Sequence, residues 1–250
     1  MPAQRTPIPL MYRAVAGVVR PTMRALTRYE VSGLDNIVRG RGFIVTPNHI
    51  SHADVFSWAH VLYREGIAPV FLAKSALFET PIVSSVMKHT NQVRVDRESG
   101  SAAASLVPAI RALKAGKCLA IYPEGSLTRD PDLWPMRGKT GAARLALDVG
   151  CPVIPIATWG PQDLLAPYSK KPHLLPRTRI QISFGPPVRL DDLRATPLTP
   201  KAVRTATDRI MAAITHELEK LRGERAPTER FDPKAHGLRS TGNYHPGGTS

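Results

Sequence analysis

The segment GFIVTPNHISHADVFSWAHVLYREG, residues 42–66, joins an apolar run to a helix-like run through a short polar loop. The run 42–48 is short and apolar, which is typical of a buried strand. Residues 52–65 have the pattern of a helix, with Ser51 as the expected N-cap and Gly66 as the expected stop. A strand that leads directly into a helix predicts one unit of an α/β fold.

Strand-like and helix-like segments continue to alternate along the rest of the chain. Further short apolar runs predict strands at 68–73, 91–97, 117–123, 151–160 and 179–188. Helices are predicted at 75–89, 101–116, 137–150 and 200–222, the last of them capped by Thr199. This alternation predicts a single α/β domain with a largely parallel mixed sheet that is covered by helices.

The two ends of the chain differ from this pattern. Residues 1–30 are basic and amphipathic, and we expect a helix kinked at Pro21. Such a helix can pack on the domain's own core or lie in a membrane interface, and its apolar stripe does not distinguish the two. The α/β domain is expected to span residues 31–222. Residues 223–250 are polar and lack periodicity, which predicts a flexible tail.

The chain is strongly basic, because 34 Lys and Arg residues outnumber 20 Asp and Glu residues, giving a formal net charge of +14. Such an excess favours nucleic acid, an anionic membrane surface, or phosphorylated and CoA-like substrates as partners. Aromatic residues make up only 6% and no nucleic-acid-binding signature occurs, so nucleic acid is not expected. No run approaches the roughly 20 apolar residues of a membrane-spanning helix, so the sequence predicts no such helix.

The two cysteines, Cys118 and Cys151, lie in apolar runs. Neither belongs to a CxxC motif or a Cys/His cluster, so the sequence predicts neither a zinc site nor a redox motif. We expect both to be buried free thiols, which fits a reducing compartment.

The loop NHISHAD, residues 48–54, places two histidines and an acid after the first strand described above, and α/β sheets gather ligands at such strand ends. Asp54 has a structural explanation, because an acid in the first turn of a helix meets the free amide groups there. The same turn can bring Asp54 against the ring of His49, fixing one ring nitrogen and leaving the other to accept a proton. His52 has no acid five residues later, because position 57 is serine. On spacing alone, both interpretations of Asp54 stand.

Two further loops carry groups that suit an anion. The loop EGSLTRD follows the predicted strand KCLAIYP, and Gly125 permits a tight turn with exposed amides beside Ser126 and Arg129. The run VRVDRES places Arg94 and Arg97 three residues apart at the end of another strand. Taken singly, an ordinary turn and a pair of solvated charges are the simpler explanations.

Together, in order and spacing, the three stretches resemble the glycerolipid acyltransferase family, the PlsC-like enzymes that acylate glycerol-3-phosphate and lysophosphatidic acid. NHISHAD matches the family's N-H-x4-D motif. NQVRVDR is similar to G-x-x-F-I-D-R, with Asn91 and Arg94 as departures. YPEGSLTR is similar to F-P-E-G-T-R-S, with Ser126 in place of threonine and Arg129 two positions late. VIPIA, residues 153–157, corresponds to a fourth motif, which is mostly apolar.

The resemblance implies transfer of a fatty acyl group from acyl-CoA or acyl-carrier protein to the hydroxyl of a lysophospholipid. Its first candidate is 1-acylglycerol-3-phosphate, which would give phosphatidic acid. His49 is implied as the general base and Asp54 as the residue that orients its ring. The implied substrate-binding residues are Arg97, Glu124, Gly125, Ser126, Arg129 and Lys74. A thioester is already activated, so we expect no metal and no cofactor besides the acyl donor.

Two alternatives remain open. The departures at Asn91 and Arg94 leave room for another hydroxyl acceptor, such as glycerol-3-phosphate or a glycolipid. The second alternative is a basic protein without catalytic activity that binds a membrane or nucleic acid. For the enzyme, an acceptor embedded in the bilayer implies a peripheral protein on the anionic, cytoplasmic side of the cell membrane.

Overall fold

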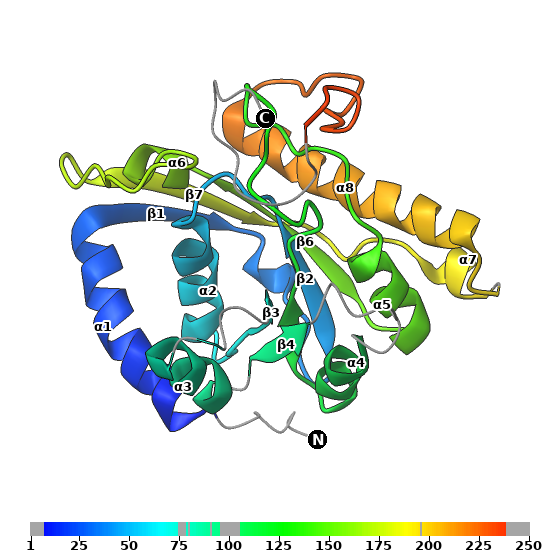
Figure 1. The fold of residues 1–250 in the computed structure, drawn as a ribbon, viewed down its shortest axis with the longest axis horizontal. Helices are drawn as coiled ribbons and strands as arrows, with labels where there is room; N and C mark the ends of the chain where they lie inside the picture. Colours follow the sequence, from blue (N-terminus) through cyan, green and yellow to red (C-terminus); the bar gives the residue numbers. More distant parts are fainter. Residues whose placement is uncertain are drawn as a thin grey trace.

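The computed structural model describes residues 8–74, 79, 81–90, 92–95, 106–195 and 197–238. In these ranges a sheet lies between two layers of helices (Figure 1). Its strands are β1 (Thr27–Ser32), β2 (Phe43–Pro47), β3 (Val70–Lys74), β4 (Val93–Val95), β5 (Cys118–Ala120), β6 (Val153–Trp159) and β7 (Thr178–Phe184). The helices are α1 (Leu10–Leu26), η1 (Leu34–Asn36), α2 (Asp54–Arg64), α3 (Pro81–His89), α4 (Val107–Lys114), α5 (Gly141–Val149), α6 (Pro161–Leu164), α7 (Asp191–Arg194) and α8 (Pro200–Arg222).

The strands of the described ranges form one sheet in the order β1-β7-β6-β2-β5-β3-β4. The pairs β1–β7, β6–β2, β2–β5, β5–β3 and β3–β4 are parallel. The pair β6–β7 is antiparallel. The prediction of an α/β fold with a largely parallel mixed sheet is therefore confirmed.

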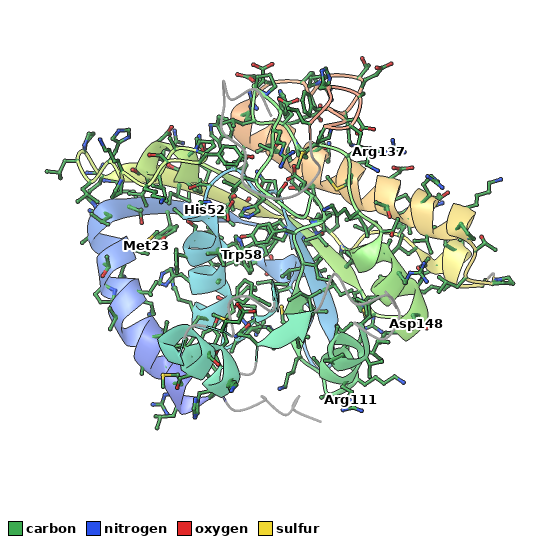
Figure 2. All side chains as sticks on the ribbon, in the orientation of Figure 1. Met23, His52, Trp58, Arg111, Arg137 and Asp148 are labelled. Atoms are coloured by element: carbon green, nitrogen blue, oxygen red, sulfur yellow. The ribbon has the colours of Figure 1, made fainter. Side chains whose placement is uncertain are left out.

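Each face of the sheet has its own apolar core. Helices α4, α5 and α8 cover one face, where they contribute Ala109, Leu145 and Ile210. Helices α1 and α2 cover the other face, where Met23 and Trp58 pack (Figure 2). Because both faces are covered, all five residues of β2 are buried, and its sequence FIVTP lacks the polar alternation of a half-exposed strand.

The N-terminal segment contains a strand that the sequence analysis did not anticipate. The helix predicted for residues 1–30 ends at Leu26 in the structure, and Pro21 lies inside it. β1 follows directly and pairs with β7 from Thr27 opposite Thr178 to Ser32 opposite Ser183. Its side chains alternate between more and less buried positions, the period of a strand at the edge of a sheet.

The segment after α8 contacts the domain. The N–H of Arg137 donates to the carbonyl oxygen of Phe231 at 3.0 Å, and the Arg137 guanidinium pairs with Asp232 at 2.8 Å. Ala226 packs against a small apolar cluster formed by Trp134, Ala157 and Leu218. The first part of the predicted flexible tail therefore has defined contacts, because its few apolar side chains and its backbone reach partners far away in sequence. The end of the tail lies outside the described ranges, where flexibility stays a prediction.

The order of the strands brings two of the predicted motifs together. β2 and β5 are neighbouring parallel strands, so their carboxyl ends lie at the same edge of the sheet. NHISHAD follows β2 and EGSLTRD follows β5 at that edge. Ligands of α/β proteins bind outside the carboxyl ends of strands, which makes this edge the place to look for a site.

Candidate active site

His49 and Asp54 contact each other just beyond the end of β2. Nδ1 of His49 lies 3.0 Å from Oδ2 of Asp54. A carboxylate only accepts hydrogen bonds, so Nδ1 donates, and the lone pair of the neutral ring then resides on Nε2. The Asp54 side chain is fully buried, whereas that of His49 is 17% exposed. The structure thus brings the two predicted catalytic residues together in the geometry of a base and its orienting acid.

The Asp54 carboxylate is held by donors on both of its oxygens. Besides His49, Oδ2 accepts the backbone N–H groups of Ile50 at 3.0 Å and Ser51 at 3.2 Å. Oδ1 accepts the hydroxyl of Tyr122 at 2.7 Å. These bonds compensate for the burial of a charge that would be costly without partners. The carboxylate cannot rotate without breaking several of them, so the orientation of the His49 ring is fixed as well.

Helix α2 begins two residues later than the sequence predicts. Its first residue is Asp54 and its N-cap residue is Ala53, so the predicted N-cap at Ser51 is wrong. The Ser51 hydroxyl instead accepts the N–H of Ala53 at 3.0 Å and donates to the carbonyl oxygen of Leu165 at 2.6 Å. The physical reason is that Asp54 binds the amides of the preceding loop, which folds that loop into a turn ahead of the helix.

The charges around the two histidines separate their roles. Burial opposes protonation of His49, but the charge and hydrogen bond of Asp54 and the charge of Glu124 outweigh it, so the pKa of His49 is raised above 6.5. Burial and the neighbouring His49 lower the pKa of His52. The two rings meet edge to face, with 6.3 Å between centroids. Of the two, His49 is the ring that Asp54 holds.

Glu124 joins the two loops. Its buried carboxylate accepts the N–H of His49 with Oε1 and the N–H of Met136 with Oε2, both at 3.0 Å. In addition, the N–H of Thr128 donates to the carbonyl oxygen of His49 at 2.7 Å. Burial raises the pKa of Glu124 to about 7, although the two amide bonds and the charge of His49 act in the opposite direction. The backbone of His49 is therefore held on both sides by the loop after β5.

A lysine that the sequence analysis missed lies against the EGS turn. Gly125 has a φ of +77°, and a Cβ there would lie 2.8 Å from Nζ and 2.9 Å from Cδ of Lys139. The positive φ favours glycine at this position, and the Lys139 side chain lies close against the turn. Ser126 is half-buried in the same turn, and its hydroxyl donates to the carbonyl oxygen of Leu127 at 3.2 Å. Lys139 went unnoticed because a lysine near the start of a predicted helix looks like any surface lysine.

The structure describes less of the other predicted substrate-binding residues. Arg129 is buried in the loop after β5, with 5% of its surface exposed. Lys74 is the last residue of β3, which pairs with β5, but its side chain lies outside what the structure describes. Arg97 lies outside the described ranges altogether. Their roles in substrate binding stay predictions.

Asn48 fixes the point at which the chain leaves the sheet. Its buried side-chain amide donates to the carbonyl oxygen of Thr158 at 3.1 Å and accepts the N–H of Thr158 at 2.8 Å. These two bonds extend the pairing of β2 with β6 by one residue, directly ahead of His49. The sequence indicates no role for Asn48 beyond its place in the motif, because its partner is 110 residues away.

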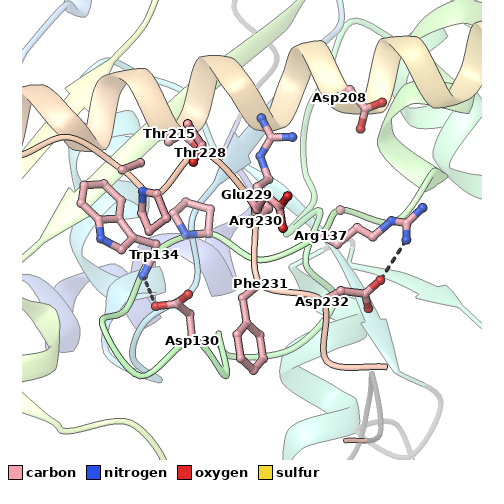
Figure 3. A pocket seen from close by; sticks show the side chains of 14 residues that line it. Asp130, Trp134, Arg137, Asp208, Thr215, Thr228, Glu229, Arg230, Phe231 and Asp232 are labelled. Atoms are coloured by element: carbon pink, nitrogen blue, oxygen red, sulfur yellow. Dashed lines mark hydrogen bonds and ion pairs between the residues drawn. The ribbon is translucent and has the colours of Figure 1, made fainter. Parts of the chain in front are cut away.

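A hollow of about 410 Å³ lies on another side of the loop after β5 (Figure 3). Residues 130–138, α8 and the segment 226–232 enclose it, and the ion pair of Arg137 with Asp232 forms part of its wall. His49 and Asp54 do not line this hollow. It is therefore distinct from the candidate active site, although its wall includes Pro135 and Arg137, the neighbours of Met136, whose N–H donates to Glu124.

Comparison with known proteins agrees with this geometry. The profile of the Acyltransferase family matches residues 28–159. A 1-acyl-sn-glycerol-3-phosphate acyltransferase of Borreliella burgdorferi is 32% identical over 130 residues, which are 52% of this chain and 50% of that protein. The protein of the same name from Bacillus subtilis is 24% identical over 216 residues, covering 84% of this chain and 100% of that one. This chain thus spans half the length of the first relative and the full length of the second.

A solved structure has a similar fold. It is the 1-acyl-sn-glycerophosphate (LPA) acyltransferase PlsC from Thermotoga maritima, with a TM-score of 0.61 and 22% sequence identity. The similarity covers 86% of this chain and 81% of that one. The segment matched by the family profile is more than half of the 250 residues and contains His49, Asp54 and the EGSLTRD loop. The chain belongs to the Acyltransferase family.

Proposed function

We propose that the protein is an O-acyltransferase that uses His49 as its general base. The observation that carries this proposal is the 3.0 Å contact of His49 Nδ1 with the buried Asp54 carboxylate, at the sheet edge where EGSLTRD also lies. A hydroxyl is a weak nucleophile at neutral pH, so its attack needs a positioned base. Such general-base catalysis contributes a rate factor of about 10² to 10⁴.

In the proposed reaction the acyl donor is a thioester of CoA or of acyl-carrier protein. The acceptor oxygen attacks the thioester carbonyl carbon while Nε2 of His49 takes the hydroxyl proton, and Asp54 stabilises the imidazolium that forms. The tetrahedral intermediate then expels the thiolate, which receives the proton from His49. An ester and a free thiol leave, and the base is regenerated. The chain needs no nucleophile of its own, because the thioester is already activated.

The acceptor that we propose is 1-acylglycerol-3-phosphate, which would be converted to phosphatidic acid. The names of the Borreliella and Bacillus relatives support this choice. We place the acceptor's phosphate on the turn of Gly125 and Ser126, with Arg129 and, from the predicted motifs, Arg97 and Lys74 as cations. For Glu124 we propose a supporting role, because its two oxygens hold backbone amides.

A screen of acceptors tests this function. The purified protein receives one long-chain acyl-CoA together with lysophosphatidic acid, glycerol-3-phosphate, another lysophospholipid or a glycolipid, and the release of free CoA and the formation of the ester are both measured. We expect turnover with lysophosphatidic acid above that with every other acceptor. Turnover with a glycolipid alone would mean a different acceptor but the same acyl-transfer chemistry. No transfer to any acceptor, in this screen or in its repeat with an acyl-carrier-protein donor, would contradict the proposal.

The pH dependence of kcat/KM provides a second test. The base must be neutral to accept a proton, and the pKa of His49 is raised above 6.5 by Asp54 and Glu124 against the effect of burial. We therefore expect kcat/KM to fall as the pH falls through a value above 6.5. The measurement is a profile of kcat/KM between mildly acidic and mildly alkaline pH. A midpoint below the ordinary histidine value, or a flat profile, would contradict His49 as the base.

We further propose that α1 and α2 face an anionic membrane. On α1, Leu10 is 78% exposed and Val18 is 70% exposed. Arg20, Arg64 and Arg24 surround His60, and burial together with these charges lowers the pKa of His60 to about 4. α1 has no acidic residue, and the Asp54 side chain of α2 is buried at the active site. Exposed apolar side chains on a helix, near arginines that have no acidic partner among the described residues, suit the headgroup region of anionic lipid.

Among the described ranges, no helix is long and apolar enough to cross a bilayer. We propose a peripheral attachment on the cytoplasmic face of the cell membrane. The two cysteines, which are buried free thiols, fit a reducing compartment.

Vesicle sedimentation tests the membrane face. The double variant Leu10→Ser with Val18→Ser should bind vesicles rich in phosphatidylglycerol at least about tenfold more weakly than the wild type, because burial of each apolar side chain stabilises the bound state. The control is Val107→Ser with Leu198→Ser, which changes two other exposed apolar residues, 43% and 44% exposed. Equal weakening by both double variants, or no binding of the wild type, would contradict the proposed face.

A further inference from the structure

Tyr122 contacts both members of the catalytic pair. Its hydroxyl donates to Oδ1 of Asp54 at 2.7 Å and accepts from Nε1 of Trp58 at 3.1 Å. Its ring stacks on the ring of His49, with 3.9 Å between centroids and 24° between planes. Trp58, which belongs to α2, is fully buried, so this chain of contacts is anchored in the core.

We propose that Tyr122 is a positioning residue for the His49–Asp54 pair, holding the carboxylate through its hydroxyl and the imidazole through the face of its ring. The inference rests on the function proposed above and deepens it. In the motif F-P-E-G-T-R-S, phenylalanine stands at this position, so the bond from a hydroxyl to Asp54 is a feature of this sequence.

The direction of the hydrogen bonds follows from the partners. The indole N–H of Trp58 can only donate, so the Tyr122 oxygen accepts there and its own proton is left for Asp54. A hydrogen bond to an ionised acceptor is stronger than one between neutral groups. The Asp54 carboxylate is thereby held on Oδ1 by Tyr122 and on Oδ2 by His49 and two backbone amides. The stacked ring prevents the imidazole from tilting out of line with the carboxylate.

The electrostatic surroundings agree with this role. In the described ranges, the ionisable groups around His49 include Asp54, Glu124, His52 and the Tyr122 hydroxyl. Burial and the Asp54 carboxylate raise the pKa of Tyr122 well above its ordinary value, so the hydroxyl keeps its proton at working pH. By donating to Asp54, it withdraws negative charge from the carboxylate that stabilises the protonated form of His49. Its removal should therefore raise the pKa of His49.

The test is Tyr122→Phe, which keeps the stacked ring and removes the hydroxyl. We expect kcat to fall about tenfold, KM for the acceptor to stay the same, and the acidic limb of the rate profile to move up by about half a pH unit. The matched control is Tyr29→Phe, which removes another buried tyrosine hydroxyl, on β1, and should change neither kcat nor the pH profile. Trp58→Phe should give a smaller shift in the same direction, because it removes the partner of the Tyr122 oxygen.

An NMR titration of the His49 ring gives a readout that does not need catalysis. An upward shift of its midpoint in Tyr122→Phe supports the inference even if the wild type transfers no acyl group, in which case the proposed function alone would fail. Unchanged kcat and an unchanged titration in Tyr122→Phe would overturn the role of Tyr122, and so would an equal effect of Tyr29→Phe. Should Tyr122→Phe not fold, Trp58→Phe decides by the same two measurements.

Discussion

His49→Ala is expected to lower kcat for acyl transfer by about 10²- to 10⁴-fold and to leave the fold intact. The variant removes the ring that would accept the proton of the acceptor hydroxyl. It keeps the backbone N–H that Glu124 accepts and the carbonyl oxygen that Thr128 binds, so the loop should hold its path. The measurement is steady-state release of free thiol together with product formation, accompanied by thermal unfolding and circular dichroism.

His52→Ala is the matched control for this variant. It removes a second imidazole from the same loop, one that Asp54 does not hold, and it should retain activity close to that of the wild type. Equal losses in the two variants would mean that the loop, not the base, had been damaged. Full activity of His49→Ala would remove His49 from the mechanism.

Asp54→Asn is expected to have the second large effect. The amide is similar in size, but it replaces an acceptor-only group with one that carries two N–H donors. At Asp54, donors approach both oxygens, so an amide nitrogen must face one of them. The ring of His49 would then lose its fixed tautomer, and we expect kcat to fall about 10³-fold, while the clash of donors lowers the free energy of unfolding by about 1–3 kcal/mol.

Kinetics and denaturant unfolding of Asp54→Asn should be compared with those of Asp148→Asn. Asp148 is an exposed acid on α5, on the opposite face of the sheet (Figure 2). The control should match the wild type in both measurements. If His49 and Asp54 act as a unit, the double variant His49→Ala with Asp54→Asn should lose no more kcat than the more damaged single variant. Multiplying losses in the double variant would contradict a shared role.

Much of the fold could be predicted from local patterns. The runs that became β2, β3, β5, β6 and β7 are short and largely apolar. Helices α2, α4 and α5 carry apolar stripes and are followed within two residues by Gly66, Gly116 and Gly150. The N-cap of α8 is confirmed, because the Thr199 side chain accepts the N–H of Ala202. β1 could not be found in this way, because its pairing with β7 joins residues about 150 positions apart and its short alternation follows an amphipathic helix without a break.

The site shows the same division between local and distant contacts. The contact of His49 with Asp54 spans five residues, so a single segment of sequence allowed it, and the resemblance to the acyltransferase motifs favoured it over a simple helix-capping role for Asp54. Tyr122 lies 68 positions from Asp54, Glu124 lies 75 positions from His49, and Asn48 lies 110 positions from Thr158. No pattern within one segment indicates such contacts. They depend on β2 having β5 and β6 as its neighbours, which is a property of the whole sheet.

The bridge made by Glu124 has a consequence for how the molecule loses its site. The Glu124 carboxylate accepts the backbone N–H groups of His49 and Met136, which belong to different loops. If either N–H leaves the carboxylate for solvent, the acceptor of the other N–H is disturbed as well. We therefore expect the two loops to open together, as one event, while the sheet beneath stays folded. Protection of these two amides from hydrogen exchange should therefore rise and fall together, at an opening free energy below that of global unfolding.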